Sequence, residues 1–284
     1  MSHLVSVSEL NELISTGAGI RLLDVRWRLD RPEGRPDYLE GHLPGAVYVD
    51  LDGELSAKGR PEHGRHPVPP IEALERAARR WGLRDGDVVV AYDDVKSVAA
   101  ARAWWLLHRA GVDVRVLDGG LGAWVAAGGA LETGDVAVAK GDVHLTDSTA
   151  GVLDIDEAAD FPETGVLLDV RAPERYRGDV EPLDPIAGHI PGAVNLPTLA
   201  HVAPDGRLRG ADELRETFAA VGVRPGVPTA AYCGSGITAA HTALALEEAG
   251  IDAQVFPGSW SEWSNTRGRP VARGILPAGD VVTP

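Results

Sequence analysis

Short apolar runs alternate along the chain with longer segments in which apolar residues recur at helical spacing. In the first half, apolar runs predict four strands, at 21–25, 46–49, 88–92 and 114–117. The amphipathic segments 71–81 and 98–110 predict helices, and a glycine follows each of them. Strands that alternate with helices are typical of an α/β fold with a mainly parallel sheet and helices on both faces.

The second half of the chain repeats the first. The sequence LLDVR at 22–26 recurs at 167–171, and GHLPGAV at 41–47 recurs as GHIPGAV at 188–194. The expected strands of the second copy are 166–170, 193–196, 229–232 and 253–256, and its expected helices are 212–221 and 238–249. Because the repeat is much longer than the unit of a solenoid, it indicates two copies of one domain.

A net charge of −15 and a single cysteine narrow the classes of function. The excess of acidic residues argues against nucleic acid as a partner. One cysteine allows no intrachain disulfide and no cysteine-based metal cluster, so we expect no metal. No apolar run approaches the ~20 residues of a membrane span, and the first ten residues lack a signal pattern. The sequence therefore predicts a cytoplasmic protein that does not contact a membrane.

The stretch 228–250, PTAAYCGSGITAAHTALALEEAG, carries the strongest chemical signal. The predicted strand 229–232 ends directly before Cys233, and the small residues of the turn that follows lead into a helix. The cysteine would thus lie at the carboxyl end of a parallel strand, where open α/β sheets bind ligands. Backbone N–H groups of the loop and the positive end of the helix dipole favour the thiolate. Cys233 is therefore predicted to be a nucleophile.

Other interpretations of this loop fit less well. A purely structural cysteine would be a small buried core residue, but the glycine-flanked place between strand and helix argues against it. A cysteine-dependent phosphatase needs Cys-x5-Arg, and Ala239 occupies the arginine position. A serine hydrolase needs Gly-x-Ser-x-Gly, and its first glycine would fall on Cys233.

The Gly-His-x-Pro-Gly-Ala turns at 41–46 and 188–193 contain histidines that could be mistaken for catalytic residues. They occur in both copies, although only one copy has a cysteine. Glycine permits the turn, proline fixes its φ, and the imidazole can bond to local backbone. We therefore expect these histidines to be structural.

The LDVR strand at 168–171, the GHIPGA turn at 188–193 and the cysteine loop together resemble the rhodanese family of sulfurtransferases. The resemblance covers nearly the whole chain. It implies a rhodanese-like domain without the cysteine at 1–135, a linker at 136–150 and a catalytic rhodanese domain at 151–284. In that family only the second domain usually carries the cysteine, and Asp93 stands at the corresponding place of the first copy.

The loop CGSGIT at 233–238 is close to the CGSGVT loop of 3-mercaptopyruvate sulfurtransferases. Thiosulfate sulfurtransferases typically have basic residues there, and this loop has none. The resemblance implies a relay of Ser235, His66 and Asp52, with His63 as a near alternative to His66. It also implies substrate-binding roles for the rest of the loop, namely Gly234, Gly236, Ile237 and Thr238.

Mercaptopyruvate enzymes usually hold the donor carboxylate with two arginines that precede the second Gly-His turn. Arg175 matches the first of them. The second would fall near Leu183 and Asp184, which supply no arginine, so Arg177 is the expected substitute.

The reaction that the resemblance implies is transfer of sulfane sulfur from 3-mercaptopyruvate or thiosulfate, through a persulfide on Cys233, without a cofactor. The acceptor would be a thiol such as thioredoxin or glutathione, or cyanide in an assay. The alternatives are thiosulfate transfer as the main activity and a non-catalytic module that relays sulfur.

Overall fold

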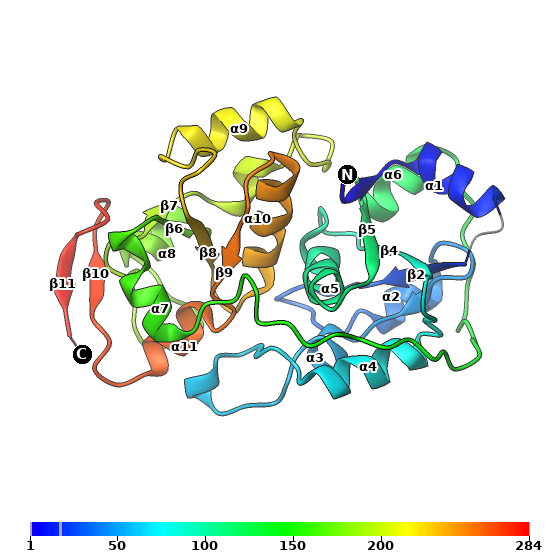
Figure 1. Ribbon diagram of the computed structural model, residues 1–284, viewed down its shortest axis with the longest axis horizontal. Helices are drawn as coiled ribbons and strands as arrows, with labels where there is room; N and C mark the ends of the chain where they lie inside the picture. Colours follow the sequence, from blue (N-terminus) through cyan, green and yellow to red (C-terminus); the bar gives the residue numbers. More distant parts are fainter. Residues whose placement is uncertain (1, 17–18, 284) are drawn as a thin grey trace. The chain divides into compact units, whose positions relative to one another are not determined.

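The computed structural model describes residues 2–16 and 19–283. It divides into two compact units (Figure 1). Unit 1 comprises Met1–Ala57, Val68–Ala150 and Ala203–Leu208, and unit 2 comprises Lys58–Pro67, Gly151–Val202 and Arg209–Pro284. Each predicted domain therefore contributes one short segment to the other unit, and the segment Lys58–Pro67 is the one that matters for the candidate site.

Unit 1 contains a five-stranded parallel sheet in the order β1-β5-β4-β2-β3. Its strands are β1 (Leu4–Val5), β2 (Ile20–Asp24), β3 (Val47–Tyr48), β4 (Val88–Tyr92) and β5 (Asp113–Leu117). Its helices are α1 (Val7–Ser15), α2 (Arg35–Glu40), α3 (Leu51–Glu54), α4 (Ile71–Arg80), α5 (Val98–Arg109) and α6 (Gly120–Ala126). Helix α4 buries one face, which accounts for its amphipathic pattern, whereas α5 is buried on nearly all sides, which accounts for its high content of apolar residues.

Unit 2 repeats this topology with four parallel strands in the order β7-β6-β8-β9. The strands are β6 (Val166–Asp169), β7 (Val194–Asn195), β8 (Thr229–Tyr232) and β9 (Gln254–Val255), and β10 (Val271–Arg273) pairs antiparallel with β11 (Asp280–Val282). The α-helices are α7 (Ile155–Asp160), α8 (Pro173–Arg177), α9 (Ala211–Ala219), α10 (Ile237–Glu248) and α11 (Ser259–Asn265). Short 3-10 helices are η1 (Pro61–His63), η2 (Phe161–Glu163) and η3 (Thr198–His201). The predicted fold class, a tandem pair of mainly parallel α/β domains, is confirmed.

The repeated Asp-Val-Arg sequence ties the central strands to the end of β8. The Asp169 carboxylate accepts hydrogen bonds from Arg171 Nη2 and Tyr232 Oη, both at 2.6 Å, and Arg171 Nη2 also donates to the carbonyl of Gly188. All of these groups are buried, and Tyr232 directly precedes Cys233. Because a buried ion pair is costly to break, this network fixes the strand end that carries the cysteine.

The Gly-His-x-Pro-Gly-Ala histidines are structural, as predicted. His42 Nδ1 lies 2.8 Å from the carbonyl of Tyr38, and His189 Nδ1 lies 2.8 Å from that of Tyr176. In each turn the imidazole also stacks on the ring of the tyrosine whose carbonyl it contacts. These contacts join each turn to the preceding short helix.

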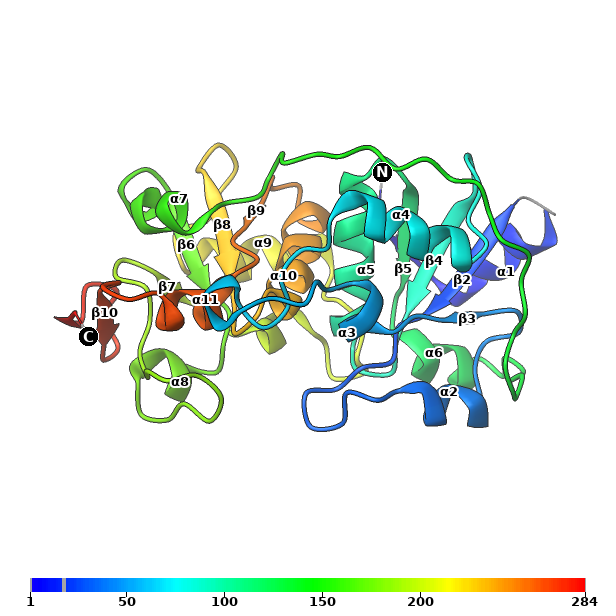
Figure 2. The ribbon, with the colours of Figure 1, turned by 90° about the horizontal axis from the view of Figure 1, so that it is seen from below.

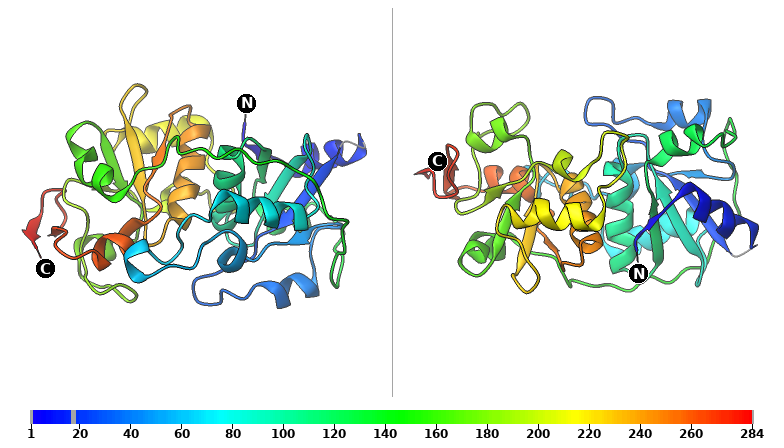
Figure 3. Two further views of the ribbon diagram at one scale, coloured as in Figure 1. Left: turned by 60° about the horizontal axis from the view of Figure 1, so that its bottom comes forward. Right: turned by 90° about the horizontal axis from the view of Figure 1, so that it is seen from above.

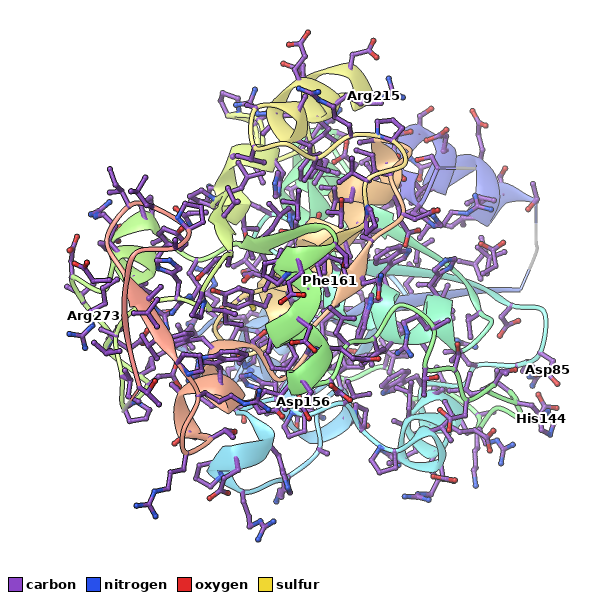
Figure 4. The ribbon with its side chains drawn as sticks, turned by 60° about the vertical axis from the view of Figure 1, so that its left-hand side comes forward. Asp85, His144, Asp156, Phe161, Arg215 and Arg273 are labelled. Atoms are coloured by element: carbon purple, nitrogen blue, oxygen red, sulfur yellow. The ribbon has the colours of Figure 1, made fainter. Side chains whose placement is uncertain are left out.

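The predicted linker at 136–150 contains no helix or strand and runs as an extended chain (Figure 3). Hydrogen bonds fasten it to unit 1, including Gly141 N to Arg79 O at 2.8 Å. His144 and Asp85, labelled in Figure 4, make a paired contact in which both the ring Nδ1 and the backbone N of His144 lie 2.8 Å from the carboxylate.

Within the described residues, no helix is long and apolar enough to cross a membrane.

Unit 2 buries a pair of histidines beside the core. His201 in η3 and His241 in α10 are both fully buried, with ring centroids 6.3 Å apart. Neither ring nitrogen of His201 has a hydrogen-bond partner among the described residues. Burial, with a smaller contribution from the nearby His241, lowers the pKa of His201 to about 3.

We expect His201 to make the fold sensitive to acid. Because its folded pKa lies below the unfolded value of about 6.5, the unfolded chain binds a proton first as pH falls, and stability is lost between about pH 6.5 and pH 3. The His201→Phe variant should therefore lose about 2 kcal/mol less than the wild type between pH 7 and pH 4.5. Urea unfolding at the two pH values measures this, and an equal loss in both proteins would contradict it.

Candidate active site

Cys233 lies between the end of β8 and the start of α10, in the arrangement that the sequence predicts. Gly236 caps α10 with a φ of 84°. A Cβ on this residue would also lie 2.4 Å from the carbonyl oxygen of Pro257, so only glycine fits here. Ile237 is buried as the first residue of α10, and Thr238 is half-buried.

The backbone of the loop bends back toward the cysteine sulfur. Gly236 N donates to Cys233 Sγ at 3.0 Å, so a backbone dipole points at the position where the thiolate charge would lie. The side chain of Cys233 is buried, with 2% exposure. The predicted arrangement of a loop N–H directed at the sulfur is therefore present.

Ser259, the first residue of α11, was not predicted from the sequence, and its side chain contacts Cys233. Ser259 Oγ accepts a hydrogen bond from Cys233 N at 3.1 Å and lies 3.9 Å from Sγ. Its φ of 55° is unusual for a residue other than glycine. The counterpart in unit 1 is Gly120, with a φ of 54°. The serine in place of this glycine in the second copy of the turn is the feature of the sequence that could have indicated a role for Ser259.

His66 and Ser235 lie together in unit 2. His66 Nδ1 is 2.8 Å from Ser235 Oγ, and both side chains are buried. The segment that carries His66 lies beside α11 (Figure 2), where Arg65 N donates to Ser261 Oγ at 3.1 Å. His63 is exposed in η1. Of the two histidines considered from the sequence, the structure therefore pairs His66 with the loop serine.

Asp52, the third member of the expected relay, belongs to unit 1. It lies exposed in the short helix α3, whose N-cap is Asp50. Its expected role beside His66 stays a prediction from the sequence.

Two guanidinium groups lie against the cysteine loop. A Cβ built on Gly234 would be 3.1 Å from Arg65 Nη2 and 3.4 Å from Arg175 Nη1. Arg175 was expected here, but Arg65 was not, because its proximity depends on the packing of the segment Lys58–Pro67. Arg177 pairs instead with Asp179, with Nε and Oδ2 at 2.8 Å. The loop itself has no basic residue, but two cations lie beside it.

Buried carboxylates hold both arginines. Glu181 accepts from Arg175 Nη2 at 2.6 Å, and Asp184 pairs with Arg65 and lies 3.5 Å from Arg175. Burial raises the pKa of Asp184, and the nearby Arg65 opposes this rise. The segment near Leu183 was expected to supply a second arginine. It supplies Asp184 instead, which binds Arg65.

The corresponding loop of unit 1 is filled by a side chain. The Asp93 carboxylate accepts hydrogen bonds from four backbone N–H groups at 2.8–2.9 Å, those of Val95, Ser97, Ala99 and Ala100. Burial raises the pKa of Asp93 to about 6, while these N–H groups limit the rise, so the group is charged at pH 7. The loop therefore encloses its own anion, at the place where unit 2 has Cys233.

Comparisons with known proteins agree with this geometry. The family model described as "Rhodanese-like domain" matches residues 6–127 and 154–266. The Mycobacterium tuberculosis protein named "Putative thiosulfate sulfurtransferase SseB" is 48% identical over 275 residues, which cover 95% of this chain and 97% of that protein. The Escherichia coli 3-mercaptopyruvate sulfurtransferase is 33% identical over 261 residues, covering 89% and 92% of the two chains. The crystal structure of SseA from Escherichia coli has a TM-score of 0.81 at 31% identity, over 92% of this chain and 99% of that one.

Both matched regions contain the repeated motifs, and the second contains the cysteine loop. The chain therefore belongs to the tandem-domain rhodanese family of sulfurtransferases, and the resemblance seen in the sequence is confirmed.

Proposed function

We propose that this protein is a sulfurtransferase that carries sulfur from 3-mercaptopyruvate to a thiol, through a persulfide on Cys233. The observation that supports this most directly is the buried sulfur of Cys233, with Gly236 N at 3.0 Å and two guanidinium groups beside Gly234. The N–H stabilises sulfur anions, and the arginines suit the carboxylate of the donor.

In the first half-reaction, the thiolate of Cys233 attacks the sulfur of the donor. The bond between that sulfur and the donor carbon breaks, its electron pair and the thiol proton go to the carbon, and pyruvate leaves. A persulfide remains on Cys233. In the second half-reaction an acceptor thiolate attacks the outer sulfur, and the cysteine thiolate is released.

His66 and Ser235 are the groups that would handle the donor proton. Their 2.8 Å contact gives the hydroxyl a partner that can accept or return a proton. Asp52 completes this relay in the hypothesis from the sequence, and Gly234, Ile237 and Thr238 form the rest of the donor-binding loop.

The donor is inferred from the charge around the loop. Arg65 and Arg175 are each paired with a buried carboxylate, so their positive charge is largely balanced. Such a site fits a monoanionic carboxylate better than the dianionic thiosulfate, which gains more from unbalanced cations. Thiosulfate transfer is the second candidate, because the relative at 48% identity bears that name.

Thioredoxin or glutathione is the proposed acceptor, and the cytoplasm is the proposed location. A lone thiol that must return to the thiolate after each turnover needs a reducing compartment. Both acceptors are dithiol or monothiol reductants that can attack a persulfide.

Steady-state kinetics with the two donors tests the proposal. We expect a higher kcat/KM with mercaptopyruvate than with thiosulfate. The Arg175→Ala variant should raise the KM for mercaptopyruvate roughly ten- to a hundredfold, because a charged hydrogen bond of about 1.5–3 kcal/mol is lost. The KM for thiosulfate should change much less. A higher kcat/KM with thiosulfate, or an equal effect of the variant on both donors, would assign the enzyme to the thiosulfate group.

A further inference from the structure

Two guanidinium nitrogen atoms beside Gly234 make no hydrogen bond to any of the residues that the structure describes. Arg175 uses Nε and Nη2 to bind Glu181, at 3.2 and 2.6 Å, and Arg65 uses Nη1 to bind Asp184. Within the described part of the chain, Arg175 Nη1 and Arg65 Nη2 donate to neither of these carboxylates. These are also the two atoms closest to a Cβ on Gly234, at 3.4 and 3.1 Å.

In the group formed by these two arginines and their partners Glu181 and Asp184, the carboxylates lie at the buried end and the guanidinium groups at the more exposed end. The side chains of Glu181 and Asp184 are only 3% and 2% exposed, whereas those of Arg175 and Arg65 are 16% and 30% exposed. The carboxylates therefore hold the guanidinium groups from the buried end, and the remaining N–H groups lie beside Gly234, the residue that follows Cys233. Two planar cations with converging free donors are well suited to bind one carboxylate.

We propose that Arg65 is the second arginine of the donor site, and that Asp184 positions it and limits the local positive charge. This inference rests on the proposed function and specifies its donor site. Asp184 binds Arg65, which comes from the segment Lys58–Pro67. Arg65 would thus supply the second guanidinium group that the segment before the Gly-His turn lacks. Asp184 also balances one cation, so the site favours a singly charged donor.

Binding of pyruvate, the leaving group, tests the role of Arg65 without any turnover. In the full-length Cys233→Ser protein, calorimetry should show that adding Arg65→Gln weakens pyruvate binding about tenfold or more. Arg60→Gln, an exposed arginine of the same segment, is the matched control and should leave binding unchanged. Arg65→Lys keeps a charge for Asp184 but loses the fork, and should weaken binding by an intermediate amount.

Two results would overturn the assignment of Arg65. One is unchanged pyruvate binding in a folded Arg65→Gln protein, and the other is a comparable loss from Arg177→Gln in its place. If thermal unfolding shows that Arg65→Gln is not folded, pyruvate binding by Arg65→Lys is measured in its place. An intermediate loss would then support the assignment, and unchanged binding would overturn it. Failure of the proposed function would appear separately, as wild-type protein that takes up no sulfur from mercaptopyruvate.

The specificity role of Asp184 is tested by kinetics. Asp184→Asn keeps the shape of the side chain but removes one negative charge, and a dianion gains more from this change than a monoanion. The ratio of kcat/KM for thiosulfate to that for mercaptopyruvate should therefore rise several-fold. A merely structural role would lower both values together, and an unchanged or lower ratio would contradict the proposal.

Discussion

Replacing Cys233 by serine should lower the rate of sulfur transfer by at least about a thousandfold, whichever donor is used. A hydroxyl at this place is far less nucleophilic than a thiolate and cannot carry a persulfide. Effects of this size are typical when the nucleophile of covalent catalysis is removed. Pyruvate release from mercaptopyruvate in the presence of an acceptor thiol measures the rate.

Mass spectrometry of the intact chain provides the matching observation for the wild type. Incubation with donor should add the mass of one sulfur atom, and dithiothreitol or cyanide should remove it. The serine variant should gain no mass and should unfold at a similar temperature, because serine keeps the small size of the side chain. Turnover by this variant at the wild-type rate would show that the sulfur is carried elsewhere.

The central strands could be predicted because their burial leaves a clear pattern. The strands β4 and β8 have the predicted limits, since each is a short apolar run that ends in a buried tyrosine. The helices α5 and α10 were each predicted within one residue of their observed ends. The short helices α2, α3, α6, α7, α8 and α11 were not predicted, because four to seven residues do not complete two turns of an amphipathic pattern. Helix α1, with nine residues, was missed as well.

The candidate site was predictable where it is local in sequence. Cys233, its turn and the helix behind it follow one another directly along the chain. The pairing of His66 with Ser235 was expected only from the resemblance, which left His63 as an alternative, and Arg65 was not expected at all. Both depend on the packing of the segment Lys58–Pro67 against α11. The role of Asp184 was hidden for the same reason, since its partner Arg65 lies far away in the sequence.

The repeated fold also shows how a copy without the cysteine keeps its loop. In unit 1 the loop leading into α5 is held in place by the four N–H groups that point at Asp93. Lys96 and Ser97 have φ values of 63° and 66°, which is unfavourable for residues with a Cβ. The carboxylate at 93 therefore stabilises a backbone conformation that the sequence of the loop does not favour by itself.

The Asp93→Ala variant should accordingly lose about 3–5 kcal/mol of folding free energy, because it leaves buried N–H groups without an acceptor. Urea unfolding of the full chain measures this loss. Asp113→Ala is the control, since the side chain of Asp113 makes an exposed pair with Arg115 at 3.4 Å, and the variant should change stability by less than about 1 kcal/mol. At a temperature where the variant is folded, its kcat with mercaptopyruvate should stay close to the wild-type value, since no thiol stood at position 93. A loss beyond about a hundredfold, roughly 2.7 kcal/mol of transition-state stabilisation, would instead give Asp93 a direct part in the chemistry.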